Sequence, residues 1–172
     1  VVGQEAEQVM IGWKFDKAAS LQTDTIDVIA EMLSNGKAGL FEVNLEQKMK
    51  LASAGAFNYG LHDYTAFIVQ ALPNKGQKLE DTRALVLGEM DKLRRGEFAD
   101  ELLPAVMANK KLNFYKGLDN NENRASIMVD AFINDQKWED VAKQLDRQSK
   151  LTKKDIIDFA NKHLRADNFV CV

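Results

Sequence analysis

The hydrophobic residues of this chain change their spacing at a few points, and this change limits the folds that the chain can adopt. In residues 7–15 (EQVMIGWKF), large hydrophobic residues alternate with mostly polar or small ones, which is the two-residue period of a strand with one buried face. The residues on the hydrophobic side are Val9, Ile11, Trp13 and Phe15. From residue 20 onward the spacing is helical, so the sequence predicts a strand followed by a helix.

The first predicted helix can be capped by Ser20 or Thr23, and residues 34–39 (SNGKAG) end it. Its hydrophobic stripe consists of Ile26, Ile29, Ala30 and Leu33. A second, short helix is expected next. One face of that helix carries Phe41, Leu45 and Met49.

Two β-type segments follow, residues 51–59 (LASAGAFNY) and 64–72 (YTAFIVQAL), separated by four residues that include Gly60 and Asp63. A connection of this length and composition predicts a β-hairpin. The first segment is rich in alanine, glycine and serine, so we expect a larger element to pack closely over it.

Residues 78–163 are predicted to form four or five helices. The first ends at Gly96, a C-cap, and the last begins with a capping box of Thr152 and Asp155. The third is capped by Asn120 or Asn121. The predicted stripes are Leu79, Val86, Met90 and Leu93; Val106, Met107, Phe114 and Leu118; Ala125, Met128 and Phe132; and Trp138, Val141, Ala142 and Leu145.

Residues 168–172 are expected to form a closing strand. The element order is then β-αα-ββ-αααα(α)-β, which predicts an α+β fold with a small, mostly antiparallel sheet of about four strands and helices on one face. Residues 1–172 are expected to form a single domain. The chain begins without methionine and ends within a predicted strand, so we expect a fragment of a longer protein.

Composition excludes several classes of function. The 23 Lys and Arg residues against 26 Asp and Glu residues give a net charge of −3, which offers no electrostatic reason to bind nucleic acid or an anionic membrane. No apolar run is long enough for a membrane span. No predicted strand carries the exposed aromatic and basic residues of an RNA-binding sheet, and Trp13 and Trp138 are expected in the core.

Metal and nucleophile chemistry have little support in the sequence. The two histidines lie far apart, His62 in the hairpin turn and His163 at a helix end, and neither belongs to H-x-x-E-H or H-E-x-x-H. The single cysteine, Cys171, is expected to be a buried thiol of the last strand. Residues 34–39 lack the phosphate-loop pattern, and residues 119–123 (DNNEN) lack calcium-loop spacing and are better explained as a helix start.

Taken as a unit, the chain resembles a known family. A strand GWKF, a helical stretch TDTIDVIAEMLSNGKAGLFEVNL, the segment EQKMKLASAGAF and a hairpin are followed by PNKGQKLEDTRALVLGEMDKLRRGEF and LTKKDIIDFANKHL. This order is similar to the C-terminal-type domain of the pitrilysin/insulinase family of inverted-zincin zinc metallopeptidases, which also includes mitochondrial processing peptidase and the core proteins of the cytochrome bc1 complex.

The resemblance draws attention to two positions at which the family's functional residues are absent from this sequence. The family's zinc lies in another domain, on H-x-x-E-H and a downstream Glu, and this sequence has no such motif. Some C-terminal-type domains bind the scissile peptide through an Arg and a Tyr in a segment like L-R-E-K-x-G-L-A-Y. Those two positions are Glu46 and Ser53 here, so neither function can be carried over. Four other residues of this sequence agree with that family segment, namely Leu45, Lys48, Leu51 and Ala52.

We therefore expect a non-catalytic structural and substrate-chamber domain of a zinc endopeptidase, with no cofactor of its own. Its expected partners are other domains of the same chain and the peptide substrate, and the compartment, cytoplasmic or periplasmic or organellar, stays open. The alternative is a scaffolding domain like the core proteins, with no protease function. A free-standing small-molecule-binding domain is a third interpretation, with less support because no pocket chemistry is evident.

Overall fold

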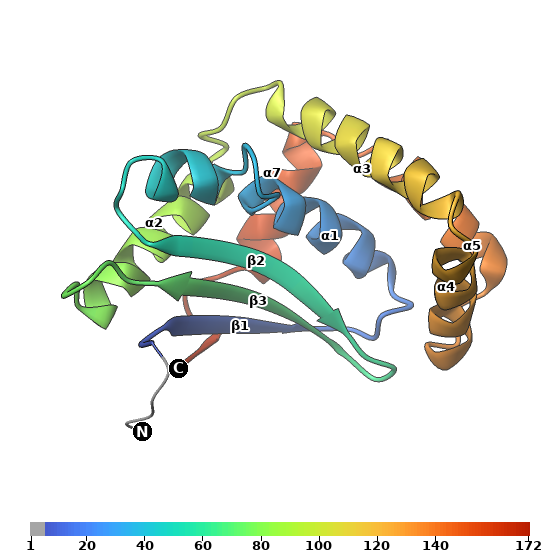
Figure 1. Cartoon of the computed structure of the whole chain (residues 1–172), viewed down its shortest axis with the longest axis horizontal. Helices are drawn as coiled ribbons and strands as arrows, with labels where there is room; N and C mark the ends of the chain where they lie inside the picture. The colour runs from blue at the N-terminus through green and yellow to red at the C-terminus, as the bar shows by residue number, and fades with distance from the viewer. Residues whose placement is uncertain (1–5) are drawn as a thin grey trace.

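A computed structural model of the chain describes residues 6–172 (Figure 1). Residues 1–5 of the predicted domain lie outside the described residues. The elements are β1 (Val9–Phe15), α1 (Leu21–Leu33), a π-helical turn η1 (Glu42–Glu46), β2 (Ser53–Gly60), β3 (Thr65–Leu72), α2 (Leu79–Arg95), α3 (Leu102–Leu118), α4 (Asn121–Ile133), α5 (Trp138–Ala142), α6 (Gln144–Gln148), α7 (Lys153–His163) and β4 (Val170–Cys171).

The strands form one antiparallel sheet in the order β2-β3-β1-β4. The first strand therefore lies inside the sheet, where it pairs with β3 on one side and β4 on the other. All of the helices lie on one side of the sheet (Figure 1). The predicted α+β fold with helices on one face is confirmed, and so is the hairpin, in which Gly60 pairs with Thr65.

Helix α1 begins and ends where side chains replace the missing helical hydrogen bonds. Ser20 is the N-cap, and its hydroxyl oxygen accepts a hydrogen bond from the backbone N–H of Gln22. After the helix, the Glu42 carboxylate accepts from the Ser34 hydroxyl at 2.8 Å and from the Gly36 N–H at 3.0 Å. These bonds hold the loop that the sequence predicted as a helix end. The helix packs over β2, as the small residues of that strand predicted.

Helices α2 and α7 pack against each other beside α1. Gly96 has φ of +72°, the left-handed conformation of a helix C-cap, and Thr152 and Asp155 form the predicted capping box. The Arg94 guanidinium also donates to the Leu164 backbone oxygen at 2.6 Å, which joins α2 to the end of α7. The predicted caps of both helices are confirmed.

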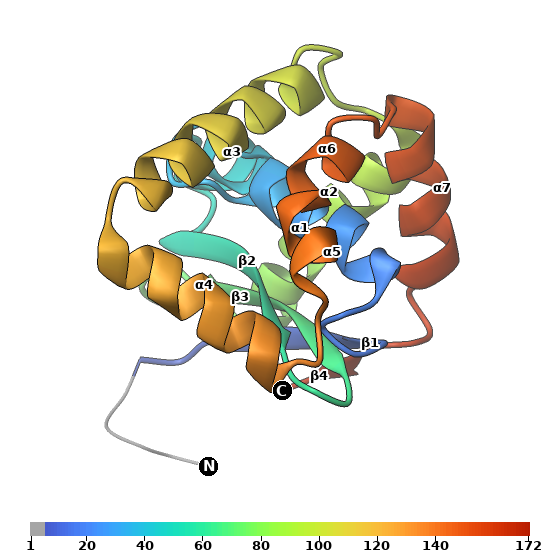
Figure 2. The ribbon, with the colours of Figure 1, turned by 90° about the vertical axis from the view of Figure 1, so that its right-hand side faces the viewer.

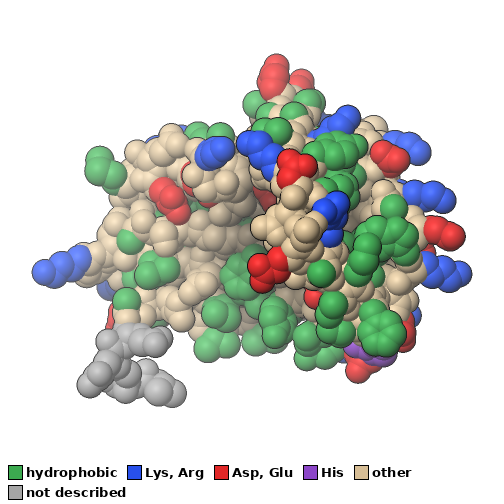
Figure 3. Space-filling model, turned by 45° about the vertical axis from the view of Figure 1, so that its right-hand side comes forward, with side chains coloured by type: hydrophobic (Ala, Val, Ile, Leu, Met, Phe, Trp, Pro, Cys, Tyr) green, Lys and Arg blue, Asp and Glu red, His purple; other side chains and the backbone are tan. Residues whose placement is uncertain are grey.

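Helices α3 and α4 lie on the opposite side of the molecule from α7, and α5 and α6 lead the chain back toward α7 (Figure 2). Two predictions about their burial were wrong. Of the α4 stripe, Met128 is 54% and Phe132 is 84% exposed, and Trp138 at the start of α5 is 49% exposed. The reason is that α4 contacts mainly its chain neighbours α3 and α5, so Ala131 is the residue that it buries. Figure 3 shows hydrophobic side chains among charged ones on this part of the surface.

Three smaller predictions also need correction. Met49 is exposed and has φ of +53°, because the chain turns out of η1 there and the helix does not continue. Cys171 is exposed because β4 is a two-residue edge strand. The predicted fourth helix is split at Lys143 into α5 and α6, so six helices follow the hairpin in the described chain instead of four or five.

Candidate functional site

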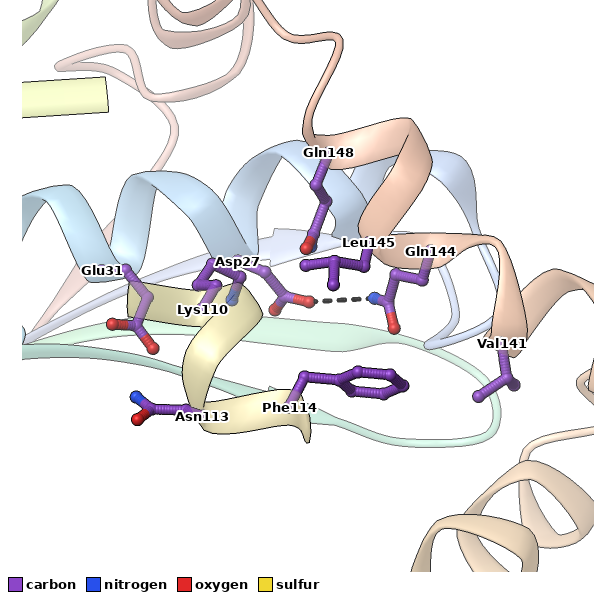
Figure 4. A pocket seen from close by; sticks show the side chains of 9 residues that line it. All are labelled: Asp27, Glu31, Lys110, Asn113, Phe114, Val141, Gln144, Leu145 and Gln148. Carbon is purple, nitrogen blue, oxygen red and sulfur yellow. Dashed lines mark hydrogen bonds between the residues drawn. The ribbon is translucent and has the colours of Figure 1, made fainter. Parts of the chain in front are cut away.

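Two adjacent cavities border α1 and α3, one on the side of α5 and α6 and the other on the side of β2, and we call them together the α1–α3 groove. The inner cavity has a volume of about 190 Å³ (Figure 4). The outer cavity has a volume of about 210 Å³ and reaches the edge of β2. Both are lined by Asp27, Glu31 and Lys110. The inner cavity is completed by Asn113, Phe114, Val141, Gln144, Leu145 and Gln148, and the outer one by Ala30, Ser34, Ala56, Phe57 and Asn58.

One flank of α1 forms the floor of the groove. Asp27, Glu31 and Ser34 are spaced four and three residues apart, which places them on one face of a helix. The opposite flank of α1 carries the buried residues Ile26 and Ile29 of the core. Lys110 reaches the groove from α3, and Figure 4 shows it beside Asp27. The groove therefore combines two carboxylates with one ammonium group.

Asp27 is held by neutral amides. Its Oδ1 accepts a hydrogen bond from Asn58 Nδ2, and its Oδ2 accepts from Gln144 Nε2 at 3.2 Å. Burial raises the pKa of Asp27 above its usual value, and the positive charge of Lys110 and the hydrogen bond from Asn58 only partly oppose this rise. The carboxylate thus lacks an ion-pair partner at hydrogen-bond distance in the described part of the chain.

Two further acceptors lie in the groove, the partly exposed carboxylate of Glu31 and the buried side-chain oxygen of Asn58. Glu31 takes part in the described hydrogen bonds only through its backbone oxygen, which accepts from Asn35 Nδ2. Asn58 Oδ1 is buried and has no hydrogen-bond partner among the described residues. A buried acceptor without a donor costs free energy, so the wall of the outer cavity favours the arrival of a donor group.

The free edge of β2 borders the outer cavity. In the β2–β3 ladder the backbone of Leu61 bonds to Tyr64, so by the two-residue period Gly55 and Phe57 also face β3. The intervening residues, Ala54, Ala56 and Asn58, present their backbone groups to the free edge. Glu46 already occupies part of this edge, because its Oε1 accepts from the Ala54 N–H at 2.7 Å. The open stretch is therefore at Ala56 and Asn58.

The two positions singled out from the sequence lie together but make different contacts. Glu46 is on η1 and binds the β2 edge, whereas Ser53 begins β2 and pairs with Leu72 of β3. Their correspondence to a peptide-binding Arg and Tyr stays a prediction. Sequence reasoning missed Asp27 and Glu31, whose i, i+4 spacing was visible, and it missed Lys110, whose approach depends on the crossing of α3 over α1.

Neither histidine is among the residues that line the groove. His62 Nδ1 lies 2.8 Å from Asp63 Oδ1, and its Nε2 lies 3.0 Å from Asp135 Oδ2 in the α4–α5 loop. These hydrogen bonds to the two carboxylates raise the pKa of His62. His163 lies against Phe159, and burial lowers its pKa. Neither lines the groove, and over residues 6–172 no three His, Cys, Asp or Glu side chains converge as a metal site would require.

A comparison with known families decides what kind of domain this is. The model of the peptidase M16 inactive domain matches residues 2–110, more than half of the chain. The chain belongs to the peptidase M16 inactive domain family. This confirms the predicted relation to the pitrilysin-type metallopeptidases and the prediction of a non-catalytic domain.

Individual relatives agree with this M16 assignment. Zinc protease PqqE of Helicobacter pylori is 26% identical over 132 residues, which are 76% of this chain and 30% of that protein. The crystal structure of a protease from Helicobacter pylori matches with a TM-score of 0.91 at 20% identity, over 96% of this chain and 40% of that one. The inactive peptidase domain of a proposed zinc protease from Bordetella parapertussis matches with a TM-score of 0.81 at 15% identity, over 99% and 94% of the two chains.

The M16 inactive domain described here thus spans 30% of the curated relative that it matches. Within residues 6–172, no helix combines the length and the hydrophobicity needed to cross a bilayer. The side chains of the described residues do not fit zinc, because no three His, Cys, Asp or Glu side chains converge among them and His62 is already bonded on both ring nitrogens.

Proposed function

We propose that this M16 inactive domain is a structural and peptide-binding part of a zinc-dependent endopeptidase, and that the zinc is held by another domain of the same polypeptide. Its membership of the family and its similarity to PqqE, of which it covers 30%, support this role. The domain, residues 1–172, would pack against the other domains and form part of the wall of the chamber that encloses the substrate.

The open edge of β2 beside the α1–α3 groove is the observation that carries the peptide-binding part of this proposal. Ala56 and Asn58 offer backbone donors and acceptors that the sheet leaves unused. An extended peptide can pair with such an edge as an added strand. The outer cavity lies directly beside these residues and provides room for the peptide's side chains.

Glu46 fixes where the added strand can begin. Because its carboxylate occupies the Ala54 N–H, a peptide pairs from Ala56 onward. We propose that this is the role of the residue at the family's Arg position, and that neither Glu46 nor Ser53 holds a scissile bond.

A pair of proline variants of the 172-residue chain tests the peptide site. Ala56→Pro removes a donor that faces the free edge, where proline is tolerated, so the chain should keep its circular dichroism spectrum and lose binding of a fluorescein-labelled extended peptide in anisotropy titrations. Gly55→Pro removes a donor that faces β3, so it should lower the unfolding midpoint instead. Unchanged peptide affinity in Ala56→Pro would show that the edge is not the site.

The parent activity needs a separate test. The full-length protein that contains this domain should hydrolyse unfolded peptides with zinc and lose that activity when its H-x-x-E-H histidines are replaced. The 172-residue chain with added zinc should show no hydrolysis. Zinc-dependent cleavage by the isolated chain would overturn the proposal, and a full-length protein that lacks both motif and activity would favour the scaffolding role.

A further inference from the structure

We propose that the α1–α3 groove selects peptides that carry a basic side chain, with Asp27 and Glu31 as the residues that recognise it. This inference rests on the proposed function, because it specifies which peptides the β2 edge would accept.

The direction of the side chains in an added strand supports the assignment. Successive side chains of a strand point to opposite faces, and those of Ala54, Ala56 and Asn58 point to the helix-covered face of the sheet. Half of the side chains of a strand paired with β2 would therefore point to the same face. Beyond β2 that face is the flank of α1 that carries Asp27 and Glu31.

The balance of charge determines which side chain the groove favours. Two carboxylates face it, and Lys110 is the single Lys or Arg among the described residues that line it. The donors that reach Asp27 are neutral amides, and Asn58 Oδ1 has none. An incoming ammonium or guanidinium group supplies hydrogen-bond donors and the missing positive charge, whereas a carboxylate would be repelled and a neutral side chain would leave the charge uncompensated.

Three synthetic peptides of one backbone test this directly. Thr-Lys-Thr-Lys-Thr-Lys-Thr carries its lysines at alternate positions, so in any register all of them face one side of the added strand. The companion peptides have Gln or Glu in place of Lys. Anisotropy titrations with the 172-residue chain should give affinity for the Lys peptide about tenfold above that for the Gln peptide, and still weaker binding of the Glu peptide.

Variants separate specific recognition from general attraction of charge. In Asp27→Asn with Glu31→Gln, the ratio of Lys to Gln affinities should fall to about one. Glu101→Gln with Asp119→Asn removes the same charge from exposed ends of α3 and should leave the ratio unchanged. Lys110→Gln removes the competing cation and should increase the ratio.

The outcomes distinguish this inference from the function on which it rests. Equal binding of the Lys and Gln peptides, or a ratio that the α3-end control abolishes as well, would overturn the basic preference and leave edge binding intact. Failure of all three peptides to bind would overturn both the preference and the peptide-binding role.

Discussion

The sheet body, formed by β1–β4 with α1, α2, α3 and α7, and the helical arm, formed by α4–α6, are stabilised in different ways. In the body, hydrophobic residues such as Ile29, Phe67 and Leu93 are fully buried. In the arm, α4 buries only Ala131 and leaves Phe132 exposed. This difference shows that the spacing of hydrophobic residues can indicate a helix without indicating that they are buried. Burial of a hydrophobic stripe also requires another element to pack against it, and the spacing does not show whether one does.

The arm is attached to the body by a few polar contacts. Arg147 of α6 pairs with Asp24 of α1, with Nε 2.5 Å from Oδ2, and Gln148 donates to the Asp24 backbone oxygen at 3.1 Å. Gln136 donates to the Ala18 oxygen at 3.1 Å, and Asp135 meets His62 of the hairpin. The arm therefore depends on individual bonds, where the body depends on packing.

The largest expected effect comes from comparing the loss of one phenylalanine side chain in the body with the loss of one in the arm. Phe67→Ala leaves a cavity in the core of the body and should lower the free energy of unfolding by about 3–5 kcal/mol. Phe132→Ala removes an exposed ring and should change it by less than about 0.5 kcal/mol. Urea denaturation measures both. A loss of several kcal/mol in Phe132→Ala would mean that α4 is covered in solution, and the comparison would fail.

The second effect concerns the strongest polar attachment of the arm. Arg147→Met leaves the buried Asp24 carboxylate without its partner and should cost about 2 kcal/mol, less than a fully buried pair because Arg147 is partly exposed. Hydrogen exchange should show faster opening of α5 and α6 than of α7. Arg95→Met breaks an exposed pair with Glu97 and serves as a control with no measurable change. Equal exchange rates in α6 and α7 would contradict the separate attachment of the arm.

The third prediction addresses the groove where arm and body meet. Burial raises the folded-state pKa of Asp27, so this group begins to destabilise the fold as the pH rises above its ordinary value, and the effect is complete above the raised pKa. Asp27→Asn should therefore increase the urea midpoint at neutral pH and match the unmodified chain in acid. The pKa of Asp100 is lowered by Lys153, so Asp100→Asn should instead decrease the urea midpoint at neutral pH. A lower midpoint for Asp27→Asn at pH 7 would refute this account.

The smallest expected effect is the pH dependence of the contact between the hairpin and the arm. Asp63 and Asp135 raise the pKa of His62, so the stabilisation is complete below the ordinary value of about 6.5 and is lost as the pH rises through the raised folded value. Amide exchange of residues 134–137, corrected for intrinsic rates, should be slower at pH 6 than at pH 8. His62→Gln should remove this dependence, and an identical profile in that variant would argue against the contact.

The success of the sequence predictions also differs between the body and the arm. In the body, strand β1, the hairpin, the Gly96 cap and the box of Thr152 and Asp155 follow from local patterns, because alternation and capping are encoded within a few residues. In the arm, Trp138 was predicted to be buried and is exposed, since burial depends on contacts between distant segments.

The groove was not predictable for the same reason. Asp27 and Lys110 are separated by more than eighty residues and meet only because α3 crosses α1. The acceptor of Asn58 becomes unsatisfied only once β2 and α1 are packed. Sequence spacing could place Asp27 and Glu31 on one helix face, but it could not show that this face borders a cavity.

The position of β1 inside the sheet has a consequence for the order in which the molecule is made. Met10 and Val172 exchange two backbone hydrogen bonds of 2.9 Å, and Trp13 Nε1 donates to the Arg165 oxygen at 3.3 Å. Strand β1, which is translated before the other described strands, therefore has no partner for its second edge until residues 165–172 are made. Until they leave the ribosome, β1 has an open side that can pair with any nearby strand, so the nascent chain is most prone to misassociation just before its synthesis reaches β4.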